Sequence, residues 1–218
     1  MISRITLIVL LLVTSTFVNA KSSLEEGIQS LQTLWAIANY DTTEDKQDKA
    51  FTDLTEQARL LTEAYPDKAQ TYVWQAIITS THAGVSGGFS ALGKVKEARR
   101  LLEKAESIDA NVLNGSIFTT LGSLYYQVPG WPLGFGNNKK AEQYLQKALT
   151  ANPDGIDSNY FYGDFLMEQN HYKDAIKYLE KSLRAADRPN RPLADKGRRQ
   201  EATTKLKEAR EIAADRES

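Results

Sequence analysis

Apolar residues recur at spacings of three and four through most of the chain, which is the spacing of one face of an α-helix. From Lys21 onward, no run alternates apolar and polar residues between turn signals as a half-buried strand does. The pattern predicts an all-α protein, with helices over residues 22–40, 44–64, 68–81, 92–107, 112–127, 138–151, 156–169, 172–186 and 192–214.

Two segments of the chain repeat the same arrangement of small and large residues. Gly122 aligns with Gly163 in the first helix of each segment. A stripe that alternates alanine with leucine lets two helix backbones approach closely and then interlock. In the second helices the aligned pairs are Ala141 with Ala175, Leu145 with Leu179 and Ala148 with Ser182.

This pattern resembles the tetratricopeptide repeat, which carries Leu-Gly in its first helix and alanine, leucine and a closing proline in its second. The resemblance implies an α-α hairpin solenoid of about four irregular repeats plus a C-terminal capping helix, which covers the last apolar face of an open stack. We expect a signal peptide at 1–20 and a degenerate hairpin at 21–66. Three repeats with two inserted loops follow at 67–187, and a basic capping helix at 188–218.

The two inserted segments, 82–93 and 128–136, interrupt the link between the first and second helix of a repeat. We expect them to be neighbouring loops that form one composite surface. The second segment carries Trp131, Leu133 and Phe135 among prolines and glycines. Two interpretations stay open: these side chains fold back as a structural plug, or they form a preformed binding ridge.

The first twenty residues have the organisation of a secretory signal peptide. Positive Arg4 precedes an apolar run at 5–13, and Val18 and Ala20 occupy the −3 and −1 positions of a cleavage site. We therefore expect cleavage between Ala20 and Lys21 and a periplasmic or secreted protein. A spanning helix needs about 20 apolar residues, so we expect no stable membrane insertion after cleavage; a retained anchor is the alternative.

Composition makes several function classes improbable. Lys plus Arg number 27 against 28 for Asp plus Glu, so no strong overall field attracts nucleic acid. The chain has no cysteine, and its 2 histidines, His82 and His171, lack partners at catalytic spacing. We interpret both histidines as surface residues and expect no catalytic residue, metal or cofactor. The stretch 188–210 is locally basic, which fits a solvated helix surface or a site for an acidic partner or anionic headgroups.

In repeats of this class, the resemblance implies that the inner face of the first helices holds extended peptides or other partners. We therefore expect a non-enzymatic scaffold that binds a protein. The inner face lacks the Lys, Asn and Arg clamp with which some members hold a peptide carboxylate. The candidate partner-binding residues are Thr119, Ser123, Tyr126, Tyr160 and Asp164 on that face, with Trp131 and Phe135 in the second loop.

The order of parts is also similar to the periplasmic T component associated with TRAP-type solute transporters: an exported chain, irregular repeats, a Pro-Gly-Trp insertion and a last helix entered through Leu-Ala-Asp. The similarity implies a role beside a periplasmic solute-binding protein, although the lipobox cysteine of the lipoprotein form is missing. The alternative function is therefore an accessory component of a solute transporter or a carrier of a small apolar ligand. Its enclosed pocket would involve Trp74, Phe118, Tyr125 and Tyr162, which also suit plain core packing.

Overall fold

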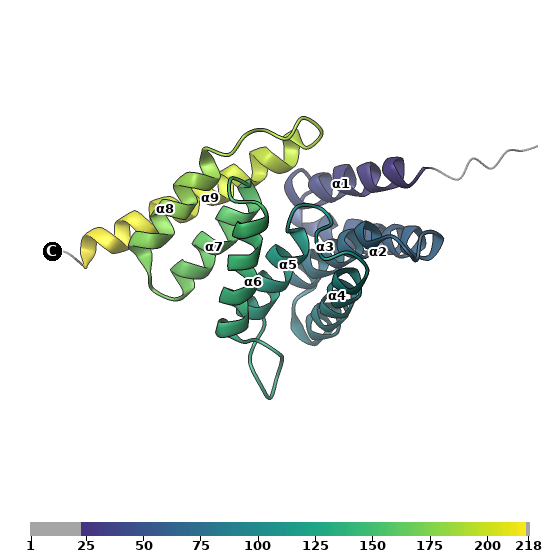
Figure 1. The fold of residues 1–218 in the computed structure, drawn as a ribbon, viewed down its shortest axis with the longest axis horizontal. Helices are drawn as coiled ribbons and strands as arrows, with labels where there is room; N and C mark the ends of the chain where they lie inside the picture. Colours follow the sequence, from purple (N-terminus) through teal and green to yellow (C-terminus); the bar gives the residue numbers. More distant parts are fainter. Residues whose placement is uncertain (1–22, 217–218) are drawn as a thin grey trace, which may run out of the picture.

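The computed structural model describes residues 23–216, and within that range every regular element is an α-helix. The helices α1 to α8 form four successive hairpins, and α9 follows them (Figure 1). The predicted all-α solenoid is confirmed, whereas the predicted signal peptide lies outside the described residues. No helix in the described range is long and apolar enough to cross a bilayer. The helices are α1 (Leu24–Tyr40), α2 (Glu44–Ala64), α3 (Ala69–Ser86), α4 (Gly88–Ile108), α5 (Ser116–Gln127), α6 (Asn138–Ala151), α7 (Ile156–Glu168), α8 (Tyr172–Leu183) and α9 (Pro192–Asp215).

The aligned glycines mark the same close approach in two consecutive hairpins. A Cβ atom added at Gly122 would lie 2.6 Å from Cγ of Leu145, and one added at Gly163 would lie 2.8 Å from Cγ of Leu179. Both distances are too short for any side chain, so each first helix needs glycine where it crosses its partner. The self-alignment of the sequence therefore describes a real structural repeat.

The predicted loop over residues 82–93 is wrong. Helix α3 continues to Ser86 and α4 begins at Gly88, so only Gly87 separates them, with a positive φ of 62°. Buried His82 and Ala83 pack inside the fold, and Ser86 donates a hydrogen bond to Asp48 of α2 at 2.8 Å. These tertiary contacts favour the extra helical turn over the local preference of the glycines. A composite surface of two loops is therefore also wrong.

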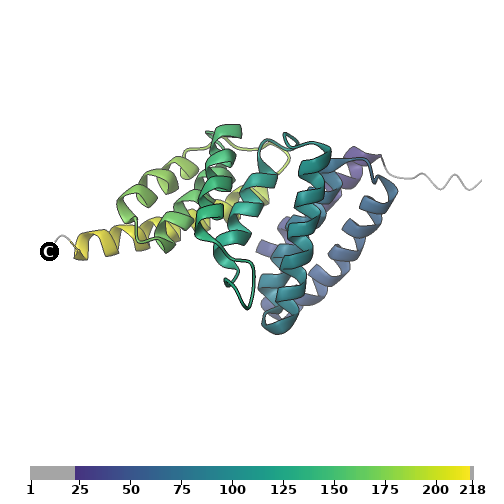
Figure 2. The ribbon, with the colours of Figure 1, turned by 60° about the horizontal axis from the view of Figure 1, so that its bottom comes forward.

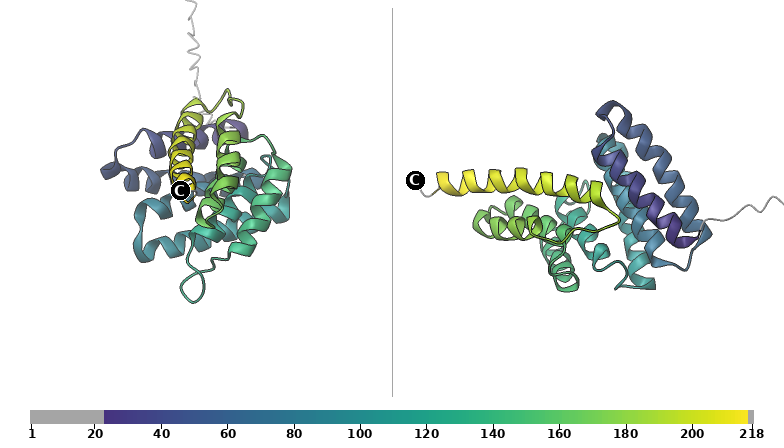
Figure 3. Two further views of the ribbon diagram at one scale, coloured as in Figure 1. Left: turned by 90° about the vertical axis from the view of Figure 1, so that its left-hand side faces the viewer. Right: turned by 90° about the horizontal axis from the view of Figure 1, so that it is seen from above.

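Helix α9 connects the two ends of the stack. It packs along α8 and α7, and its first turns contact α1 (Figure 3). A Cβ atom added at Gly197 would lie 2.4 Å from Cδ1 of Tyr40, so the two helices cross with almost no space between them. The helix thus covers the end of the solenoid and also lies against its first hairpin.

Candidate functional site

The loop between α5 and α6 carries an exposed apolar ridge. Trp131 is 90% exposed and Leu133 is 66% exposed. The loop projects away from the helices, on the side of the molecule where α3 and α4 meet (Figure 2). We call these two side chains the Trp131–Leu133 ridge.

Phe135, in the same loop, is half-buried against the body of the solenoid. Its ring meets that of Tyr125 edge-on at 5.6 Å, and the guanidinium of Arg99 lies 4.5 Å from its centroid. Backbone hydrogen bonds from Gly136 to Pro129 and from Asn137 to Tyr125 hold the loop in place. Each of the two interpretations therefore holds for part of the loop. Phe135 folds back as a plug, and Trp131 and Leu133 are exposed.

A cavity of about 510 Å³ lies where the inner faces of α3, α5 and α7 meet α1, the α8–α9 link and the start of α9. Its lining includes the candidate residues Thr119 and Ser123, both nearly buried. Other inner-face positions of the first helices also line it, so these helices do share one concave surface. They are Ile77, Ser80, Ser116 and Asp157.

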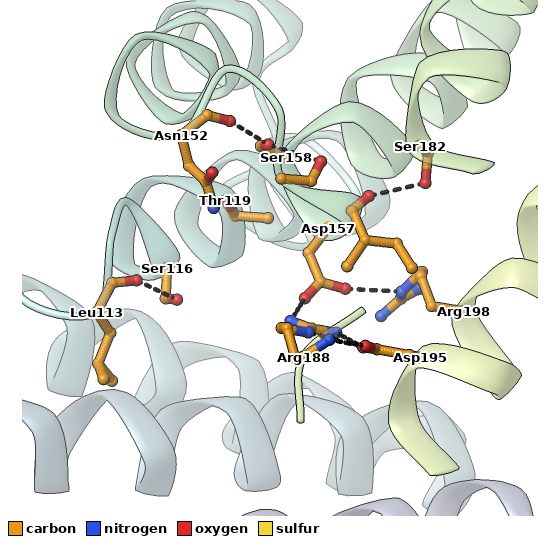
Figure 4. A network of polar contacts seen from close by, with 12 residues as sticks. Leu113, Ser116, Thr119, Asn152, Asp157, Ser158, Ser182, Arg188, Asp195 and Arg198 are labelled. Atoms are coloured by element: carbon orange, nitrogen blue, oxygen red, sulfur yellow. Dashed lines mark hydrogen bonds and ion pairs between the residues drawn. The ribbon is translucent and has the colours of Figure 1, made fainter. Parts of the chain in front are cut away.

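An ion-pair network on one wall of this cavity holds the start of α9 in place. Asp157 of α7 accepts from Nε of Arg198 at 2.9 Å and from Nη1 of Arg188 at 2.6 Å, and Arg188 also pairs with buried Asp195 (Figure 4). Burial by itself would raise the pKa of Asp157, but the guanidiniums of Arg198 and Arg188 outweigh it and hold this pKa well below its usual range. Asp157 is therefore charged at neutral pH and ties α7 to α9.

The candidate residues Tyr126, Tyr160 and Asp164 lie beneath α9. The hydroxyl of Tyr126 donates to Oδ2 of Asp164 at 2.7 Å, and Nζ of Lys205 lies 3.1 Å from Oδ1 of the same carboxylate. The guanidinium of Arg198 lies 4.4 Å from the ring centroid of Tyr160. Burial raises the pKa of both tyrosines. Tyr160 and Asp164 are buried here and Tyr126 is half-buried, and the role of all three in binding stays a prediction.

The basic stretch at the C-terminus is largely used inside the fold. Lys205 and Arg198 face the acids of α7, and Arg210 pairs with Glu180 of α8 at 2.7 Å. The sequence indicates the basic C-terminal stretch and, separately, Asp164 on the inner face. The acids of α7 and the bases of α9 have opposite charges, and the two helices are separated by one helix in the stack. That charge complementarity was the signal that could have predicted the ion pairs and the arginines of the cavity wall.

The four aromatic residues expected to enclose a pocket are not together. Trp74 lines the inner-face cavity, whereas the rings of Phe118 and Tyr125 stack on Tyr144. Tyr162 packs edge-on against the ring of another tyrosine, in α8. Phe118, Tyr125 and Tyr162 therefore serve side-chain packing, the interpretation that their helical spacing also allowed, and the cavity has different walls.

His82 is buried, which corrects its interpretation as a surface residue. Its Nε2 lies 3.2 Å from Oδ1 of Asp48, and its ring stacks on Phe51. Burial and the charge of Lys94 lower the pKa of His82, although Asp48 acts in the opposite direction. Among residues 23–216, no three His, Asp or Glu side chains are grouped as metal ligands would be.

Comparison with known proteins agrees with this architecture. Residues 133–191 match the tetratricopeptide repeat family. The crystal structure of a thermophilic TPR protein from Thermus thermophilus superimposes with a TM-score of 0.55 at 15% identity, covering 84% of this chain and 100% of that one.

Two further structures resemble the chain less well in shape. MamA AMB-1 has 18% identity and a TM-score of 0.47, covering 87% of this chain and 96% of its own. Pseudomonas aeruginosa pilF has 17% identity and a TM-score of 0.36, covering 89% of this chain and 100% of its own. No curated protein matches the sequence. The chain therefore folds as a tetratricopeptide-repeat solenoid, with the family's sequence pattern recognisable over residues 133–191.

Proposed function

We propose that this chain is a non-enzymatic scaffold that binds a protein partner through the Trp131–Leu133 ridge. The observation that carries the proposal is a tryptophan 90% exposed to solvent on a loop whose other aromatic residue, Phe135, is anchored. Tryptophan is among the residues that contribute most to protein interfaces. Because the loop is already held by its hydrogen bonds, it loses little conformational entropy when a partner binds.

The pattern of residues 1–20 supports export, and we place the scaffold in the periplasm or outside the cell. A solute-binding protein as partner, and the likeness to the T component of TRAP-type transporters, stay predictions. Both would be tested by the identity of the protein that the ridge captures.

The test compares recovery of the partner with wild-type and variant chains in the cells that make the protein. Tyr126 and Tyr160 belong to the packed region beside α9, so both are left unchanged. The variant is the double substitution Trp131→Ala with Leu133→Ala. Leu60→Ala is the control, because Leu60 is an exposed apolar residue of α2, a helix that contacts neither α5 nor α6. We expect the ridge variant to lose the partner and the control to keep it, with unchanged helix content in both. Equal recovery by all three chains would remove the ridge from consideration.

A further inference from the structure

Arg191, the residue directly before α9, lines the inner-face cavity without an ion pair. The neighbouring Arg188 and Arg198 both bind Asp157, and each has a second carboxylate besides. Within residues 23–216, no carboxylate lies at ion-pair distance from Arg191, and its Nε is buried without a hydrogen-bond partner. Three guanidiniums therefore gather at this wall, and one of them is left without an anion.

Of the groups that the structure describes, two indole rings, and no carboxylate, lie beside the guanidinium of Arg191. The guanidinium carbon of Arg191 lies 5.1 Å from the ring centroid of Trp74 and 6.0 Å from that of Trp35. Burial lowers the pKa of Arg191, with Asp157 acting against it, whereas the pKa of Arg188 and of Arg198 is raised. A partly buried cation in such surroundings gains free energy from any anion that reaches it.

The remaining walls offer hydrogen-bond acceptors and apolar surface. The hydroxyls of Ser116, Thr119 and Ser123 donate to backbone carbonyls of their own segment, so their oxygens stay able to accept. The indole Nε1 of Trp74 is buried and has no partner. Ile77, Leu113 and Phe161 supply apolar contacts. A volume of about 510 Å³ is in the range of small-molecule sites.

We propose that the inner-face cavity binds a small organic monocarboxylate, with the carboxylate paired to the guanidinium of Arg191 and the apolar body against Trp74, Ile77 and Phe161. In the described part of the chain, the guanidinium of Arg191 has no carboxylate at ion-pair distance, and its planar fork of donors matches the two oxygens of a carboxylate. The phosphate group of an ester carries two negative charges, and Arg191 would pair with only one of them. This site is separate from the ridge and goes beyond the scaffold function.

Indole signals report the binding directly. The chain has 3 tryptophans, of which Trp35 and Trp74 line the cavity and Trp131 lies on the ridge. Three indole N–H resonances of the mature chain, assigned with Trp→Phe variants, are followed during titration with 3-phenylpropanoate and, separately, with its neutral analogue 3-phenylpropanamide. Probe concentrations up to roughly 10 mM detect even millimolar affinity.

We expect phenylpropanoate to shift the Trp35 and Trp74 signals in a saturable way and to leave Trp131 unmoved. The amide should bind at least about tenfold more weakly, because it lacks the charge-assisted bond. Arg191→Gln should weaken phenylpropanoate binding by about tenfold or more. Arg210→Gln, which changes an arginine of α9 that does not line the cavity, should bind phenylpropanoate as the wild type does.

A second variant covers the case in which Arg191→Gln fails to fold. Ser123→Leu fills part of the cavity from α5 and leaves Arg191 in place, so it should also weaken binding of phenylpropanoate. Equal affinity for acid and amide, unchanged binding by Arg191→Gln, or indole signals that do not move with phenylpropanoate would each overturn the proposal.

Discussion

The hairpins α5–α6 and α7–α8 share one packing pattern, but their inner faces differ. At two equivalent positions α5 carries Ser116 and Ser123, which face the cavity, whereas α7 carries Asp157 and Asp164, which hold α9. The links differ too, because α5–α6 has the loop with the ridge and α7–α8 has a short turn. Equivalent positions in a repeat therefore supply uncharged cavity wall in one hairpin and ion pairs to α9 in the next.

The largest expected effect comes from removing the carboxylate that joins α7 to α9. Asp157→Ala leaves two guanidiniums short of a partner and should lower the free energy of unfolding by about 2–4 kcal/mol. The equivalent change in α5, Ser116→Ala, should cost about 0.5–1 kcal/mol, the value of one hydrogen bond. Urea unfolding measures both. Similar losses for the two variants would mean that the hairpins do not differ as described.

Lowering the pH should destabilise the regions around His82 and Asp157 at different pH values. The pKa of Asp157 is lowered in the fold, so its contribution is present above its unfolded value near 4 and is lost as pH falls below that. The pKa of His82 is also lowered, so the contribution of its neutral form is present above about pH 6.5 and is lost as pH falls through its folded value.

Stability measured against pH should therefore show one loss beginning below about pH 6.5 and another below about pH 4. His82→Gln should remove the first and Asp157→Asn the second. If either variant removed the other's transition, the assignment of the two groups would be wrong.

Within the α5–α6 loop, Phe135 and Trp131 should behave differently. Phe135→Ala removes the contacts with Tyr125 and Arg99 and should cost about 1–2 kcal/mol, less than for a fully buried ring. The thermal midpoint checks it. A loss within experimental error would show that the loop is not anchored by its aromatic ring.

The smallest effect is expected on the ridge. Trp131→Ala removes a side chain that is 90% exposed and should change the free energy of unfolding by no more than about 0.5 kcal/mol. The same urea experiment measures it. A loss as large as that of Phe135→Ala would place Trp131 among the structural residues.

Much of the fold could be predicted because its signals are local. Helical spacing and the glycine–leucine pairs, such as Gly163 with Leu179, are set by residues of one hairpin. The cavity could not be predicted in this way, because the link between α8 and α9 has to return to α1 and α3 before Arg191 meets Trp35 and Trp74. The helical state of residues 82–86 was missed for the same reason, since contacts with α2 decide it.

The most direct test of the scaffold function places a photoreactive amino acid at position 131 or at position 168 of the full chain. These positions lie at corresponding ends of the two hairpins, and Glu168 is exposed at the end of α7. After irradiation of the cells that make the protein, we expect one protein adduct from position 131 and not from position 168. The same adduct from position 168, with none from position 131, would contradict recognition by the ridge.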